Sequence, residues 1–71
     1  MSEQIQYKVD PMVIQSLKDK NKFNNGFFYK TNIDKSKIEK FLNGQSTMIH
    51  YDTACVIAKE LDMNWKMLIM L

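Results

Sequence analysis

The side chains with the clearest chemical potential in this sequence are lysines gathered in the middle of the chain. Residues 18–40 hold seven lysines against three acidic residues, a net charge of +4, whereas the rest of the chain has a net charge of −2. A local excess of positive charge is the minimal feature of a nucleic-acid-binding surface, although a solvated lysine-rich surface has the same composition. All ten basic residues are lysine, whereas arginine makes the commonest specific contact with guanine. The charge pattern therefore allows phosphate binding and leaves base recognition to other side chains.

His50 and Cys55 are the residues that could supply a catalytic base and a nucleophile. His50 stands just before a predicted helix, where capping or solvent exposure is expected. Cys55 lies beside an alanine on that helix, as is typical of a small buried hydrophobic residue. The sequence has no metal-ligand spacing and no glycine-rich phosphate loop. We therefore expect neither enzymatic activity nor a cofactor or metal.

Length and composition indicate one small folded domain. The chain has 71 residues, of which 45% are hydrophobic and 25% are charged, values that are ordinary for a soluble globular protein. A single cysteine cannot form an intramolecular disulfide, and neither a signal-peptide pattern nor an apolar run of about 18 residues is present. We expect a cytosolic protein that does not enter a membrane.

The elements that must position the lysines are predicted to be helices. Apolar and polar residues alternate over 5–9, which indicates a short strand or an extended arm that pairs with a partner or frays. Capping residues, apolar spacing and turn residues then predict five helices, over 11–20, 24–31, 34–43, 51–61 and 64–70, with a loop over 45–50. The predicted starts are capped by Asp10, Asn24 and Asp34, and left-handed residues are expected at Asn32 and Gly44. The expected fold is therefore an all-α, five-helix domain over 10–71 that follows an extended segment over 1–9.

This order of helices and two local strings resemble the Cro and lambda-type repressor family of helix-turn-helix proteins. Residues 33–44, IDKSKIEKFLNG, are similar to the turn and recognition helix of that family, and residues 51–65 are similar to the helix that follows. The resemblance covers residues 10–71. It implies the five-helix lambda-repressor-like fold and a role in transcription regulation, although such domains also serve purely as protein-binding modules.

One hypothesis that follows from the resemblance is operator binding in the manner of Cro. The helix that begins near Asp34 would enter the major groove of DNA. Such a protein would dimerise through the N-terminal segment or through the methionine-rich C-terminal helix to span two half-sites. The residues expected to face base edges are Lys35, Ser36 and Lys37, and those expected to touch phosphate or base are Lys40 and Gln45.

The chain departs from the family pattern in the second helix. Between Phe23 and Ile33 it has one residue fewer than the family usually has, so that Phe28 or Tyr29 falls where the family has a small alanine. Close crossing of two helices requires a small side chain at that position. Asn32 also replaces the glycine of the turn. We therefore expect a distorted second helix, which in the family lies across the DNA backbone.

A second hypothesis, protein binding, rests on apolar residues at expected surface positions. Leu42 and Val56 fall where the family usually has charged side chains, and further apolar exposure is expected at Met48, Ile49, Met67, Met70 and Leu71. In this respect the chain is similar to small anti-repressors of temperate phages, among them the modulators of repression of lactococcal phages. That resemblance implies a protein of the host bacterial cytoplasm that binds the phage repressor, alone or on operator DNA. The candidate anchors are Phe27, Phe28, Tyr29, Leu42 and Met48.

A third interpretation is an antitoxin or another helix-turn-helix module without a phage role. A toxin encoded beside the protein would favour it.

Overall fold

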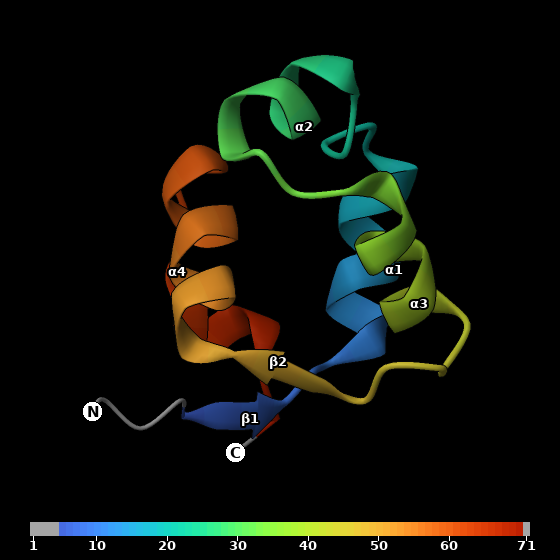
Figure 1. The fold of residues 1–71 in the computed structure, drawn as a ribbon, viewed down its shortest axis with the longest axis vertical. Coiled ribbons are helices and arrows are strands. Elements are labelled where there is room, and N and C mark those ends of the chain that lie inside the picture. Colours follow the sequence, from blue (N-terminus) through green and yellow to red (C-terminus); the bar gives the residue numbers. More distant parts are fainter. Residues whose placement is uncertain (1–4, 71) are drawn as a thin grey trace.

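The structure is a computed structural model that describes residues 5–70 (Figure 1). The strand pair lies at one end of the long axis of the molecule and α2 lies at the other (Figure 1). These residues form a small, mostly helical domain. In chain order its elements are β1 (Gln6–Lys8), α1 (Pro11–Asp19), α2 (Asn25–Thr31), α3 (Lys35–Leu42), β2 (Met48–His50), α4 (Tyr51–Glu60) and the 3₁₀ helix η1 (Trp65–Leu68).

The ends of the helices are set by local signals. The side chain of Asp10 accepts a hydrogen bond from the Met12 amide at 3.0 Å, and that of Asn24 accepts one from the Phe27 amide at 3.0 Å. Asn32 ends α2 with a φ of 58°, a left-handed conformation that asparagine adopts more readily than most residues. Gly44 follows α3 with a φ of 81°. These caps and turns confirm the sequence predictions.

Asp34 is an exception among the predicted caps. It precedes α3, but its side chain makes no capping hydrogen bond. The Lys37 amide, which a capping side chain would bind, instead donates to the Asp34 backbone carbonyl at 3.0 Å. The first turn of α3 is therefore closed by the backbone, and the predicted side-chain cap is wrong.

The N-terminal segment is an integral strand rather than an arm. β1 pairs antiparallel with β2, with Tyr7 opposite Ile49. On its other side Val9 forms a bridge with Ile69, and the Lys8 carbonyl accepts a hydrogen bond from the Met70 amide at 2.8 Å. The end of β1 and the residues that follow it are therefore bonded on both sides within the chain, which ties this segment to the domain. The predicted loop over 45–50 is also wrong in part, since it contains β2.

The C-terminal helix is shorter and tighter than predicted. The sequence predicts a helix over 64–70, whereas the structure has a 3₁₀ helix over Trp65–Leu68 whose first turn is capped by Asn64. Ile69 then adopts an extended conformation because it pairs with Val9. The expected all-α, five-helix fold is therefore corrected to four α-helices, one 3₁₀ helix and a two-stranded sheet within residues 5–70.

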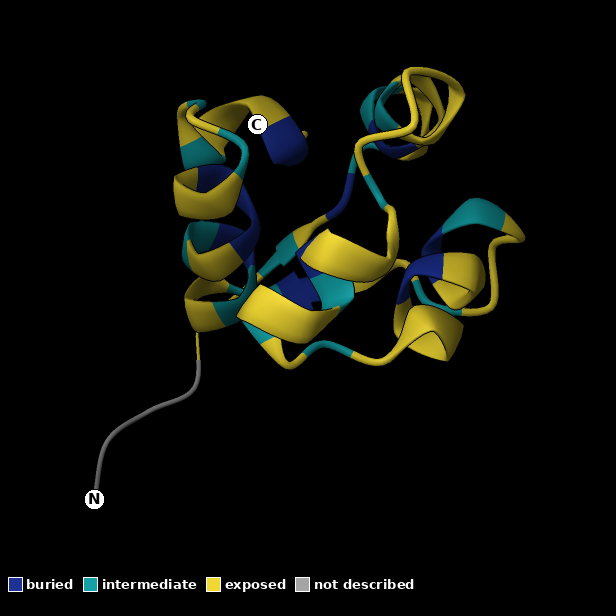
Figure 2. Ribbon diagram, turned by 90° about the horizontal axis from the view of Figure 1, so that it is seen from above, coloured by how far each residue is buried: buried dark blue, intermediate teal, exposed yellow. Residues whose placement is uncertain are grey.

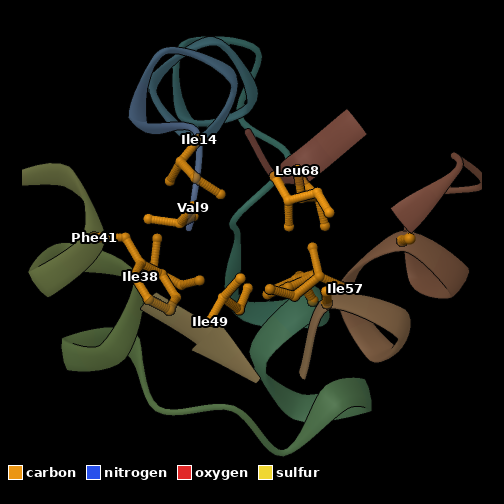
Figure 3. Packing of buried hydrophobic residues seen from close by; sticks show 11 residues of the cluster. Val9, Ile14, Ile38, Phe41, Ile49, Ile57 and Leu68 are labelled. Carbon is orange, nitrogen blue, oxygen red and sulfur yellow. The ribbon is translucent and has the colours of Figure 1, made fainter. Parts of the chain in front are cut away.

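The core draws residues from every element. Side chains of β2 and of all helices converge at the centre, with Ile14, Ile49, Ile57 and Leu68 almost completely buried (Figure 3), and Tyr7 of β1 packs half-buried against this core. The main packing partner of α3 is α1, and that of α2 is α4. Figure 2 shows the exposed residues on the outward sides of the helices. The full set of buried residues is Val9, Ile14, Phe27, Ile38, Phe41, Ile49, Ala54, Ile57, Ala58, Leu68 and Ile69.

Replacing Val9 by alanine tests whether the N-terminal strand belongs to the folded core. Val9 is 3% exposed, so Val9→Ala should lower the free energy of unfolding by about 2 kcal/mol through lost burial and a residual cavity. Urea unfolding followed by circular dichroism measures this change. Lys8→Ala, at the exposed neighbouring position, is the control. An unchanged midpoint in Val9→Ala would show that the segment behaves as a detachable arm.

Candidate interaction face

The helix α3 presents a polar outer surface because two of its residues are anchored in the core. Ile38 and Phe41 are both 2% exposed. Residues of an α-helix follow one another at about 100°, so Ser36 and Lys40 lie on the side opposite this buried pair. Both are exposed. They are the side chains of α3 that a flat or convex partner would meet first.

The five residues predicted to contact DNA do not share one face. All five are exposed or on exposed turns, but Lys37 and Gln45 line a groove between α3 and β2. Lys35 lies on the opposite flank of α3, on the same side as Leu42, because residues seven apart are nearly aligned along a helix. The structure thus divides the set into an outward pair, a groove pair and one flanking lysine.

Electrostatics of this region are dominated by lysines without acidic partners. Within residues 5–70 one ion pair is present, between Lys30 and Glu60, with Nζ and Oε2 separated by 3.7 Å. It joins α2 to α4 and involves none of the α3 lysines. The positive charge of Lys35, Lys37 and Lys40 is therefore available to an approaching ligand, reduced by nearby Asp34 and Glu39.

The predicted apolar anchors have three different environments. Phe27 is 3% exposed and packs edge-to-face against Phe23 and Phe28, with ring centroids 5.0 and 5.3 Å apart. It is a core residue, so its assignment as a surface anchor is wrong. Phe28 and Leu42 are half-buried and pack against the core, whereas Met48 is 44% exposed.

Tyr29 is the most exposed large hydrophobic residue of the described chain, at 89%. The reason is helical geometry: α2 turns Phe27 and Thr31 toward the core, which leaves Tyr29 pointing away from it. Phe28 lies between these two directions and is half-buried. The three consecutive aromatic residues therefore form a gradient from core to solvent. We call Phe28, Tyr29 and the outward side chains of α3 the interaction face.

The second helix is an α-helix over Asn25–Thr31 with a capped start, so the expected distortion is not found within it. α2 packs mainly on α4 rather than on α3. Tyr29 is 89% exposed and so does not lie at a helix crossing, whereas Phe28 is half-buried. A phenylalanine at a crossing point keeps two helix backbones further apart than an alanine does. The resulting motif has the order helix, turn and helix, with Asn32 in the left-handed turn position, but its two helices do not form a principal packing pair.

Other exposed apolar residues lie outside the interaction face. Val56, Met67 and Met70 are exposed as expected, whereas Ile49 is 1% exposed, so its predicted exposure is wrong. Leu71 lies outside the described residues. Sequence reasoning missed Met12, which is 80% exposed on α1. The apolar spacing of Val13, Ile14 and Leu17 could have indicated this exposure, because Met12 lies outside the face that these residues define.

An aromatic cluster of half-buried Tyr7 and Trp65 with exposed Tyr51 lies beside η1. The ring of Trp65 lies 5.2 Å from that of Tyr7 and 4.9 Å from that of Tyr51, measured between centroids. Cys55 is half-buried on α4. Hydrogen bonding to the Cys55 thiol, followed by charge repulsion from it, raises the pKa of the Tyr51 phenol above its ordinary value of 10.0. This cluster joins strand β1 to α4 and η1, and sequence periodicity alone did not indicate it.

Geometry supporting metal or redox chemistry is not found in the described part of the chain. Residues 5–70 contain no group of three histidine, cysteine, aspartate or glutamate side chains placed to hold a metal ion. His50 is half-buried at the start of α4 and makes no side-chain capping hydrogen bond. None of the helices in the described residues has the length and apolar character required to cross a membrane.

Comparison of the chain with protein families, with curated proteins and with solved structures finds no match. The interaction face and the residues that form it are therefore the features from which function is inferred.

Two alanine variants on α2 should show by their stability which aromatic side chain is buried and which is exposed. Phe27→Ala should destabilise the fold by about 3–5 kcal/mol because it removes a buried ring. Tyr29→Ala should change the free energy of unfolding by less than about 0.5 kcal/mol because its ring lies in solvent. Thermal unfolding followed by circular dichroism compares them. Similar losses in both variants would mean that Tyr29 packs against the domain.

Proposed function

We propose that this protein is an anti-repressor of a temperate-phage genetic switch that binds the phage repressor through its interaction face. The observation that supports this best is Tyr29, a large aromatic side chain that is 89% exposed on the helix that resembles the first helix of a helix-turn-helix motif. Tyrosine is enriched among the residues that dominate binding energy at protein interfaces, because it buries a large area with few rotatable bonds.

The neighbourhood of Tyr29 suits a protein partner better than a DNA backbone. Phe28 beside it is half-buried, so apolar area next to the tyrosine is available when a partner covers it. An aromatic ring at a DNA-facing position adds little affinity for phosphate, whereas interface cores are depleted in charge and enriched in aromatic residues. The lysines of α3 would form a polar rim and speed association with an acidic surface.

The proposed mechanism is occlusion of the repressor. When the anti-repressor covers part of the repressor's DNA-binding surface, operator and anti-repressor compete for the same protein, and repression is relieved as the anti-repressor concentration rises. No chemical step is required. The proposal also allows a complex of this protein and the repressor on operator DNA. In that complex the lysines of α3 would contact phosphate.

Alanine substitution of Tyr29 tests the proposal directly. Tyr29→Ala should weaken binding to the repressor of the same phage by at least about 2 kcal/mol, roughly thirtyfold in Kd, as expected when a central aromatic anchor is lost. Isothermal titration calorimetry with the purified repressor measures the change. The control is Met12→Ala, which removes another strongly exposed apolar side chain (80%) from α1 and should bind normally. Equal affinities of Tyr29→Ala and the unsubstituted protein would contradict the proposal.

The alternative function is direct operator binding in the manner of Cro. It is favoured by the outward position of Ser36 and Lys40 and by the absence of ion pairs to the α3 lysines among residues 5–70. In that case the helix α3 would enter the major groove, and the face would read bases with serine and lysine.

Fluorescence anisotropy with labelled operator DNA separates these functions. Under the proposal, the protein alone should bind operator and scrambled duplexes equally weakly, with affinity that falls steeply from about 50 to 200 mM salt, because lysine–phosphate contacts release counterions. Lys40→Ala should reduce the slope of log affinity against log salt concentration by about one, as expected for the loss of one phosphate contact. Preferential binding to the operator at 200 mM salt, lost in Ser36→Ala, would instead support the Cro-like function.

A further inference from the structure

A groove runs between α3, β2 and the first turn of α4. It has a volume of about 360 Å³, the space of roughly a dozen water molecules at about 30 Å³ each. This is enough for a carboxylate side chain together with the backbone that bears it. Its lining includes Lys37, Phe41, Gln45, Met48 and Thr53.

The side chains that line the groove favour a negatively charged ligand. Lys37 is the one charged residue in the lining, and no aspartate or glutamate lines the groove. Gln45 and Thr53 add an amide and a hydroxyl that can donate hydrogen bonds. Phe41, which is 2% exposed, closes one wall with an apolar ring. A carboxylate on an aliphatic stem would meet a cation and donors at its tip and an apolar surface along its stem.

The backbone of β2 adds hydrogen-bonding groups at the same place. The Val9 amide donates to the Thr47 carbonyl, and the Tyr51 amide donates to the Ile5 carbonyl. The hydrogen-bonded pairs of this ladder are therefore those at positions 5, 7 and 9, and the pairs at positions 6 and 8 lie between them. In an antiparallel ladder, the residues of such non-hydrogen-bonded pairs point their amides and carbonyls away from the partner strand. Met48 opposite Lys8 is such a pair. The amide and carbonyl of Met48 therefore face away from β1.

We propose that this groove binds an acidic side chain from an extended segment of a protein partner, with Lys37 as its counterion. The inference rests on the proposed function in taking a protein, rather than a nucleic acid, as the partner. A DNA duplex presents its phosphates in a regular array on a convex surface, and strong binding to it requires several cations. This groove is concave and has one cation, which matches a single inserted carboxylate.

The groove and Tyr29 would serve as two separate contacts of one partner. The groove lies beside β2, at the end of the molecule opposite α2 (Figure 1), and α3 connects the two regions. Complementary charge in the groove would fix the orientation of the partner, while the aromatic anchor supplies apolar burial.

The test is a titration of the ¹⁵N-labelled full chain with a five-residue peptide that contains two glutamates, and with its twin in which both are glutamine. With the glutamate peptide, amide shift changes should concentrate at Lys37, Gln45, Met48 and Thr53. In Lys37→Gln the fitted affinity should fall by roughly threefold or more, which is the upper range for a solvent-accessible ion pair. Lys59→Gln, which removes an equivalent exposed charge from the last turn of α4, should bind the peptide like the unsubstituted protein.

Three outcomes with the peptides would overturn the inference. They are equal responses to the glutamate and glutamine peptides, shift changes located away from the groove, and equal losses in Lys37→Gln and Lys59→Gln. A further titration uses a short DNA duplex in place of the peptide. Larger shift changes at the groove with the duplex than with the peptide would assign the site to phosphate and contradict a protein partner. Because no repressor is present in this experiment, its failure is distinguishable from failure of the proposed function, which calorimetry with the repressor tests separately.

Discussion

The structure depends on the position of Val9 between two distant parts of the chain. Its amide donates to the Thr47 carbonyl at 3.0 Å, the residue forms a bridge with Ile69, and its side chain is 3% exposed. This one residue therefore ties the N-terminal strand to the segment after α3 and to the segment after η1. A chain of 71 residues has little apolar area to bury, and joining three segments at one point closes the core without a further helix.

Closure at Val9 determines how the helices are presented. The loop between α3 and β2 is held by the sheet, so α3 is fixed at its C-terminal end as well as by Ile38 and Phe41 in the core (Figure 3). α2 lies at the opposite end of the molecule, where it packs mainly on α4 (Figure 1). It contributes one fully buried side chain, Phe27. A short helix with a single buried anchor has a large outward surface, and this surface bears Tyr29.

The same arrangement separates two kinds of surface along α3. Near α2 the accessible side chains are aromatic and aliphatic, whereas near β2 a groove offers a lysine, an amide, a hydroxyl and strand backbone. Apolar burial supplies most of the binding energy at protein interfaces, and charge complementarity contributes more to orientation and association rate. In this domain the two kinds of surface lie toward opposite ends of α3.

Sequence by itself determined the features that arise within one or two helical turns. The caps at Asp10 and Asn24, the left-handed Asn32 and the glycine after α3 depend on side chains that bond to backbone only a few residues away, so their positions could be predicted. Tertiary structure decided the rest. β2 has three residues and forms only because β1 pairs with it, and Ile69 is extended rather than helical because Val9 lies beside it. Which of three consecutive aromatic residues is buried was likewise decided by the direction in which α2 meets α4, since local spacing does not specify the contacts between residues that are distant in sequence.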